Sequence, residues 1–220
     1  MNYSNPLNPQ KNLILLGGGG HCKSVIDVAE AAGYNILGIL DRPDEVGKEV
    51  LGYKVIGTDD DIANYVDKAE FIITVGFVTN PKIRIKLDNK IKDAGGKLAT
   101  IISPTAYVSP QATIGDGTVI MHRAVICVNV KIGRNCIINT LTDVDHEASI
   151  GDFTHLSAGV LIGGGARVGE RCFCGMGTTV VHMVTLGNDI IMGAGSLAIK
   201  DVNDPGVYCG HPAKYLRKNE

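Results

Sequence analysis

The sequence lacks the features that mark several broad classes of protein. Its formal net charge is only -2, and aromatic residues make up 5% of the chain and do not interleave with basic ones. Neither feature supports a nucleic-acid-binding surface. No apolar run approaches the ~20 residues that span a bilayer, and the polar residues 1–12 do not resemble a secretory signal. We therefore expect a cytoplasmic protein that binds neither nucleic acid nor membrane.

What the sequence does contain is an unbroken six-residue repeat. One apolar position recurs through Ile102, Val108, Ile114, Ile120, Ile126, Ile132, Ile138, Val144, Ile150, Leu156, Ile162, Val168, Cys174, Val180, Leu186, Met192 and Ala198. Four residues later the side chain is small or β-branched, as in Ala106, Ala112, Thr118, Ala124, Val130, Cys136, Thr142, Ala148, Thr154, Val160, Ala166, Cys172 and Thr178. Hexapeptides with two inward positions are the signature of a parallel β-helix.

Each coil of this β-helix should use about 18 residues, in three flat faces. Seventeen hexads make a little under six coils, or a prism of roughly 25 to 30 Å at a strand spacing of about 4.8 Å. Glycine often follows the apolar position, which suits a corner. Cys136, Cys172 and Cys174 fall on inward positions, where we expect them to act as small hydrophobic residues.

The N-terminal third has a different pattern, which alternates strands and helices. A strand at 12–16 runs into the glycines at 17–20 and a helix at 24–32, followed by strands at 36–40 and 71–75 and a surface helix at 81–94. This βαβ order predicts a small, Rossmann-like parallel sheet. We divide the chain into a Rossmann-like domain at 1–98, a β-helix at 99–202 and a C-terminal tail at 203–220.

The glycines at 17–20 indicate a phosphate site, because a glycine loop that enters a helix presents backbone N–H groups and a partial positive charge. The dinucleotide fingerprint is imperfect, since Cys22 stands where its third glycine would be. A tight turn without a ligand is an equally good interpretation of the glycines alone. Asp41 follows the second strand, where an acidic residue meets a ribose or base or caps the loop.

His146 is the candidate catalytic residue of the repeat. Residues 18 apart stack vertically, so His146, Gly164 and His182 should form one column at a corner. An outward imidazole among the acidic residues of segment 143–148 suits a general base. Gly164 should leave room, and an exposed backbone N–H, for an incoming acyl group. The alternative is a histidine on a solvated corner with no function.

A metal site is a weaker interpretation of the same histidines. Carbonic anhydrases of the left-handed β-helix class use histidines spaced as His146 and His182 are, with a third ligand five residues further on. Gly187 occupies that position here, and a tetrahedral site needs three protein ligands. We therefore expect no metal.

Taken together, these motifs resemble those of the bacterial sugar acyltransferases of the PglD/NeuD type. The resemblance covers nearly the whole chain and rests on segments 16–21, Asp41, 75–76, 145–155 and 207–214. It implies a left-handed β-helix that holds acetyl-CoA, an N-terminal domain that holds a nucleotide-linked amino sugar, and a homotrimer with active sites between subunits.

The resemblance also implies roles for individual residues. His146 would deprotonate the acceptor, Glu147 would orient its imidazole, and Gly164 would stabilise the oxyanion through its N–H. Asn139 would help to place the substrate. The coenzyme would be contacted by His155, Met176 and Ala194, and the nucleotide by Gly20, His21, Asp41 and Gly76.

The reaction that the resemblance implies is the N-acetylation of a nucleotide-activated sugar, most simply a UDP-linked 4-amino-4,6-dideoxyhexose, by direct attack on the thioester. Arg42 and Phe77 differ from residues common in the UDP-sugar members, so GDP and dTDP stay open as alternatives. A hydroxyl acceptor needs the same base, which leaves O-acetylation of sialic or nonulosonic acid as an alternative. A sugar-nucleotide-binding scaffold without catalysis is the third.

Overall fold

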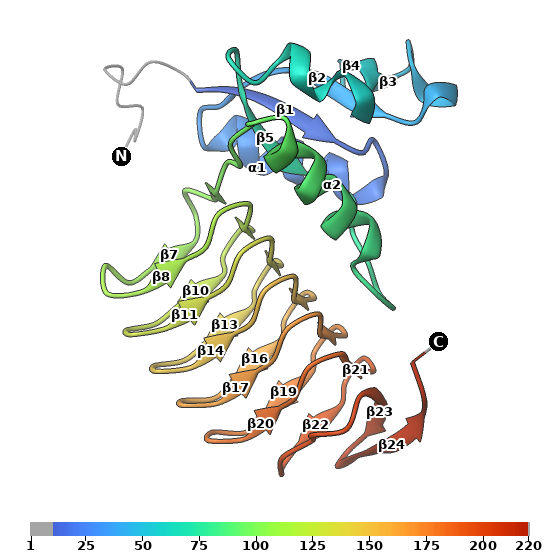
Figure 1. Cartoon of the computed structure of the whole chain (residues 1–220). Coiled ribbons are helices and arrows are strands. Elements are labelled where there is room, and N and C mark those ends of the chain that lie inside the picture. The colour runs from blue at the N-terminus through green and yellow to red at the C-terminus, as the bar shows by residue number, and fades with distance from the viewer. Residues whose placement is uncertain (1–10, 220) are drawn as a thin grey trace.

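A computed structural model describes residues 11–219 and contains a small α/β domain followed by a long β-helix (Figure 1). The α/β domain lies over the first coils, and the remaining coils extend away from it toward the C-terminus (Figure 1). Both expected fold classes are therefore present, in the expected order along the chain.

The N-terminal sheet has five strands in the order β3-β4-β2-β1-β5. Its strands are β1 (Asn12–Leu16), β2 (Asn35–Asp41), β3 (Glu49–Val50), β4 (Tyr53–Thr58) and β5 (Glu70–Ile73), all parallel except β3. The helices are α1 (Gly20–Ala31) and α2 (Lys82–Asp93), with 3₁₀ helices at Pro43–Glu45 and Asp59–Asn64. The parallel βαβ arrangement predicted from the sequence is confirmed.

Two details of this domain differ from the sequence-based prediction. Strands β3 and β4 were not anticipated, because β4 alternates buried and exposed residues near the sheet edge and lacks a continuous apolar run. Helix α1 begins at Gly20, ahead of the expected start at residue 24. His21 and Cys22 therefore belong to its first turn, which places His21 beside the glycine loop.

The β-helix has three faces, which we number in chain order. Face 1 contains β6 (Ile101–Ile102), β9 (Val119–Ile120), β12 (Ile137–Ile138), β15 (His155–Leu156), β18 (Phe173–Cys174) and β21 (Ile190–Met192). Face 2 contains β7 (Tyr107–Val108), β10 (Val125–Ile126), β13 (Asp143–Val144), β16 (Leu161–Ile162), β19 (Thr179–Val180) and β22 (Leu197–Ala198). Face 3 contains β8 (Thr113–Ile114), β11 (Lys131–Ile132), β14 (Ser149–Ile150), β17 (Arg167–Val168) and β20 (Thr185–Leu186).

The two inward positions of the hexapeptide form the core of the prism, as the repeat predicts. Ile126, Val144 and Cys174 are fully buried, and so are small residues such as Ala148, whereas Ala106 and Ala112 of the first coil are partly buried. Inward threonines satisfy their hydroxyl groups on a backbone carbonyl: Thr154 Oγ1, for example, donates to Gly169 O at 2.8 Å. Burial raises the pKa of Cys136 and of Cys172 to about 12, so these thiols stay protonated and pack as apolar groups.

Glycines occur at the corners for a reason other than the expected turn conformation. The residues with positive φ recur every six positions and include Asn129, Glu147 and Asp189, so side chains are tolerated there. The glycines that follow the apolar position are needed because adjacent coils approach closely. A Cβ on Gly151 would lie 2.6 Å from the backbone nitrogen of Glu170 in the next coil.

The two ends of the prism differ. Ile102 lies in the first coil, where no coil precedes it, and 38% of its surface is exposed instead of being buried as expected. At the other end, the segment expected as a tail forms β23 (Gly206–Gly210), parallel to β21, and β24 (Ala213–Arg217), antiparallel to β23. Tyr208 of β23 packs against the core and caps the last coil.

The two domains share one apolar core and a buried polar contact. Ile101, Val119 and Ile137 point outward from face 1, yet they are buried with Val25 and Ala29 of α1. Helix α2 is attached through a carboxylate: Asp88 accepts hydrogen bonds from Arg134 Nη1 at 2.9 Å and Asn135 Nδ2 at 3.0 Å.

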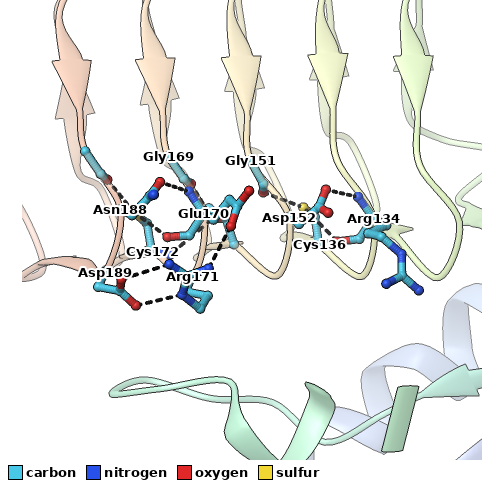
Figure 2. A network of polar contacts seen from close by, with 12 residues as sticks. Arg134, Cys136, Gly151, Asp152, Gly169, Glu170, Arg171, Cys172, Asn188 and Asp189 are labelled. Carbon is cyan, nitrogen blue, oxygen red and sulfur yellow. Dashed lines mark hydrogen bonds and ion pairs between the residues drawn. The ribbon is translucent and has the colours of Figure 1, made fainter. Parts of the chain in front are cut away.

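The corner between faces 3 and 1 connects successive coils through polar side chains (Figure 2). Asp152 accepts from the Arg134 N–H at 2.9 Å, and Arg171 pairs with Asp189 through two contacts of 2.9 and 3.0 Å. Arg134 thus contacts both the next coil and α2, so this corner fixes the α/β domain on the prism.

We predict that Gly151→Ala lowers the free energy of unfolding by at least about 2 kcal/mol, because its methyl group would overlap the backbone of the next coil. Gly159→Ala is the matched control, since its φ is +67° but no atom lies within 4 Å of the added Cβ. It should cost about 1 kcal/mol. Denaturant unfolding of both variants measures the difference, and equal destabilisation would contradict the close-approach explanation.

Candidate active site

A cavity of about 810 Å³ opens at the carboxyl ends of β1, β2 and β5. All four residues predicted to surround the nucleotide line it, namely Gly20, His21, Asp41 and Gly76. Parallel α/β sheets bind ligands at this edge. The sequence therefore identified one wall of a real pocket.

The N-terminus of α1 opens into this cavity without a cap. Gly19 occupies the N-cap position, a side-chain cap is absent among residues 11–219, and the first turn contains no acidic residue. Gly17 makes the preceding turn at φ +104°, and any Cβ there would lie 2.5 Å from Val75 Cγ2. Unpaired N–H groups with the positive end of the helix dipole favour an anion at this point.

Asp41 holds the glycine loop in place. Its Oδ2 accepts from the Gly18 N–H at 2.6 Å, and its Oδ1 accepts from the Arg42 N–H at 2.8 Å. The loop-capping role considered for this carboxylate is therefore present in the structure. Its contact with a ribose or base stays a prediction, on a residue that lines the cavity.

His146 lies on the corner between faces 2 and 3, in the turn from β13 to β14. Its side chain is 56% exposed and lies between two carboxylates, with Nδ1 3.9 Å from Glu147 Oε2 and Nε2 3.9 Å from Asp145 Oδ2. These separations exceed a hydrogen bond, although catalytic contacts often shorten only when substrate is bound. Asp145 and Glu147 are therefore charged neighbours of this imidazole, one beside each ring nitrogen.

Gly164 stacks directly against this imidazole in the next coil, as the 18-residue spacing predicts. A Cβ on Gly164 would lie 2.6 Å from His146 Nε2, so only glycine leaves that space open. The flanking Gly165 N–H donates to His146 O at 2.8 Å and fixes the two turns together. The Gly164 N–H itself has no acceptor within residues 11–219, so it is free to bind an oxyanion.

Three further predicted residues lie on another corner, between faces 1 and 2. Met176 and Ala194 are exposed and stack in one column, and Asn139 precedes them in an earlier coil. The Met176 carbonyl accepts from the Gly195 N–H at 2.8 Å, and Asn139 Oδ1 accepts from the Thr140 N–H at 2.8 Å. This corner flanks the same face 2 as the His146 corner, on its opposite edge.

His155 lies on face 1, beside the nucleotide pocket. Its Nδ1 pairs with Phe77 O at 2.8 Å, its ring packs edge-on against Phe77 and Phe173, and its centroid is 6.4 Å from that of His21. The Nε2 atoms of both histidines are buried without a hydrogen-bond partner in the described chain. Burial lowers the pKa of His155 to about 4 and that of His21 to about 3, so both rings are neutral at neutral pH.

Sequence reasoning missed two buried charges that position the pocket. Arg84 is 1% exposed and donates to the carbonyls of Ile73 at 2.7 Å and Val75 at 2.9 Å. Ile73 is the last residue of β5, and Val75 immediately precedes Gly76. The sequence did offer one signal for these buried charges. Arg84 and Asp88 have i, i+4 spacing and so share one face of α2, which we had interpreted as a surface helix.

The predicted site residues thus fall into two groups that one chain does not bring together. The nucleotide pocket, His155 and the Met176 corner lie on or beside face 1. His146, Glu147 and Gly164 occupy the corner of the triangular prism opposite face 1. No helix in the described part of the chain has the length and hydropathy of a membrane span, and no three His, Cys, Asp or Glu side chains there are grouped to hold a metal.

Comparison with solved structures identifies relatives that cover nearly the whole chain. PerB from Caulobacter crescentus, whose crystal structure contains CoA and GDP-perosamine, is 35% identical with a TM-score of 0.87, over 93% of this chain and 97% of PerB. The acetyltransferase domain of PglB from Neisseria gonorrhoeae FA1090, solved with acetyl coenzyme A, is 32% identical with a TM-score of 0.87, over 94% and 100% of the two chains.

Sequence comparisons agree with this structural match. Residues 12–91 match the PglD N-terminal domain family. The UDP-N-acetylbacillosamine N-acetyltransferase of Bacillus subtilis (strain 168) is 33% identical over 116 residues, which are 50% of this chain and 51% of that protein. An uncharacterised protein of Acanthamoeba polyphaga mimivirus is matched over 23% of its length. The chain therefore spans about half or less of the length of the curated relatives that it matches.

A Rossmann-like domain joined to a left-handed β-helix with an exposed corner histidine defines the class of hexapeptide-repeat acyltransferases. Within that class, the chain belongs to the PglD-type family of sugar acyltransferases. The resemblance inferred from the sequence motifs is confirmed.

We predict that the buried histidines make stability depend on pH. The folded pKa of His155, about 4, lies below its unfolded value of 6.5, so the unfolded chain binds more protons in between. The contribution of the neutral His155 ring to the free energy of unfolding is complete above pH 6.5 and is lost as the pH falls toward 4. The loss amounts to about 2 kcal/mol at pH 5. His155→Phe should therefore lose less stability than wild type between pH 7 and pH 5, as measured by denaturant unfolding. Parallel losses would show that His155 is not buried in the neutral form.

Proposed function

We propose that the protein transfers the acetyl group of acetyl-CoA to the amino group of a nucleotide-activated sugar. The observation that carries this proposal is the contact between His146 and Gly164, which places a base and a free N–H donor side by side at an open corner. The relatives in complex with CoA, acetyl coenzyme A or GDP-perosamine support the same chemistry.

The reaction follows from these two groups. His146 accepts a proton from the sugar amine, whose nitrogen attacks the thioester carbonyl carbon. The carbonyl oxygen becomes an oxyanion, which the Gly164 N–H stabilises, and such a donor contributes about 3 to 4 kcal/mol. Collapse of the intermediate forms the amide and releases CoA as its thiolate, which takes up the proton. Glu147 and Asp145 stabilise the imidazolium that exists after His146 accepts the proton and before the thiolate takes it up.

A second copy of the chain would complete the site. In a trimer with face 2 toward the threefold axis, the His146 corner of one subunit meets the Met176 corner of its neighbour. That neighbour also supplies its nucleotide pocket and His155. Exposed apolar side chains on and beside face 2 support this packing: Tyr107, Val125, Leu141, Leu161, Met176 and Met183 are all exposed in one chain.

The sugar acceptor is proposed as a nucleotide-linked 4-amino-4,6-dideoxyhexose. PerB was solved with GDP-perosamine, and the Bacillus subtilis relative is a UDP-N-acetylbacillosamine N-acetyltransferase, so GDP and UDP are both candidate nucleotides. The reaction would take place in the cytoplasm, where acetyl-CoA and nucleotide sugars are made. A panel of UDP-, GDP- and dTDP-linked amino sugars, with free sialic acid, separates N-transfer from O-transfer through the mass of the product.

We predict that His146→Ala lowers kcat about 10²- to 10⁴-fold, the usual contribution of a general base. Thiol release from acetyl-CoA measures the rate, and the melting temperature should not change because the side chain is exposed. His182→Ala is the matched control, since His182 is exposed in the same column two coils further on. Wild-type turnover by folded His146→Ala would favour a binding scaffold without catalysis.

A complementation experiment tests the intersubunit site. Gly20→Trp should block the nucleotide pocket, because Gly20 lines the cavity and has no atom within 4 Å of an added Cβ. Co-expressed with His146→Ala, the two inactive chains should give about one quarter of wild-type activity by random assembly of a trimer. No recovery from mixed oligomers, or a monomer by light scattering, would contradict the shared site.

A further inference from the structure

We propose that Lys86 binds the diphosphate of the nucleotide substrate, opposite the uncapped N-terminus of α1. This inference rests on the proposed function and adds to it a binding residue that no sequence motif identified. Lys86 and the glycine loop at 17–20 line the same cavity, at which α2 supplies the wall facing α1. Backbone N–H groups and a lysine on opposite sides of a pocket form a common environment for phosphate groups.

The geometry of α2 directs Lys86 into the cavity. Ile83, Lys86 and Leu87 follow one another at i, i+3 and i+4, so they share one helix face, and all three line the cavity. The neighbouring face carries Arg84 and Asp88, which are both 1% exposed. Because the face with Arg84 and Asp88 is buried, the face that carries Lys86 is directed toward the cavity.

That direction is fixed by several hydrogen bonds from the buried face. Arg84 Nη1 bonds to the carbonyls of Ile73 and Val75, Arg84 Nη2 donates to Asn135 O at 3.2 Å, and Asp88 binds Arg134 and Asn135. These contacts connect α2 both to the end of β5 and to the β-helix. If α2 rotated so that Lys86 left the cavity, these hydrogen bonds of Arg84 and Asp88 would break.

The other charges of the cavity already have partners. Arg42 pairs with Asp44 at 3.6 Å and with Glu45 at 3.3 Å, and Asp59 pairs with Lys90 at 2.9 Å. Asp41 accepts from two backbone N–H groups. Lys86 is exposed and has no ion pair among residues 11–219, so it is the cation of this wall that remains available to a ligand.

A diphosphate would use this available charge. Without Lys86 the cavity presents two carboxylates, Asp41 and Asp59, to a dianionic group. Only the amides of α1 and Arg42, which is already paired with Asp44 and Glu45, would then oppose that repulsion. An ammonium group on a flexible stem acts as a point charge toward phosphate oxygens and does not require a fixed orientation. The contact should therefore contribute to the affinity for every nucleoside diphosphate and should not select the base.

The test measures binding of GDP, UDP and dTDP by calorimetry to the wild type, Lys86→Ala and Lys82→Ala. Lys82 is exposed on the same helix but does not line the cavity, so its variant is the matched control. We expect Lys86→Ala to lower the affinity for the nucleoside diphosphate that wild type binds most tightly by about tenfold or more. Guanosine or uridine should bind equally to all three proteins, and the KM for acetyl-CoA should not change.

The outcomes separate this inference from the function on which it rests. Equal diphosphate affinity of wild type and Lys86→Ala would overturn the role of Lys86 and leave the proposed function intact. If the wild-type protein binds none of GDP, UDP and dTDP, that result would contradict both the role of Lys86 and the proposed function. Lys86→Arg provides a further check, because it should retain much of the affinity by keeping the positive charge.

Discussion

The close stacking of one coil on the next is the constraint on which this structure depends. Each strand pairs with the strand 18 residues away, and corner glycines that follow the apolar position, such as Gly151, let backbones approach where a methyl group would overlap. The same spacing that buries Val144 in the core places Gly164 against the imidazole of His146. Catalytic geometry at the corner is therefore a consequence of register, and no separate loop has to be ordered to create it.

The attachment of the α/β domain depends on burying charge as well as apolar surface. Arg84 and Asp88 lie in the domain boundary, where both form hydrogen bonds to the β-helix, and an unpaired charge there would be costly. This attachment fixes the edge of the nucleotide pocket against face 1. It also places that pocket opposite the corner of His146, which is why we propose that two subunits share each site.

Sequence periodicity predicted most of the fold and the stacking of Gly164 on His146. The β-helix, its inward positions and the column containing His146 and Gly164 follow from a six-residue repeat that has few structural solutions. The strands β3 and β4 did not show such a signal, because they lie at the edge of a sheet and alternate exposed residues with buried ones. The corner glycines were recognised, but the reason for them lies in contacts between residues 18 or 19 apart.

By itself the sequence determined which side chains face the core, which corner carries the histidine and which loop opens the first helix, because these depend on local spacing. Only the tertiary structure decided what lies next to what across the chain: that Asp41 caps the glycine loop, that His155 packs against Phe77, and that α2 turns Lys86 toward the cavity. Such contacts depend on how two domains dock. Docking is decided by the summed burial of surfaces far apart in sequence, which no local pattern encodes.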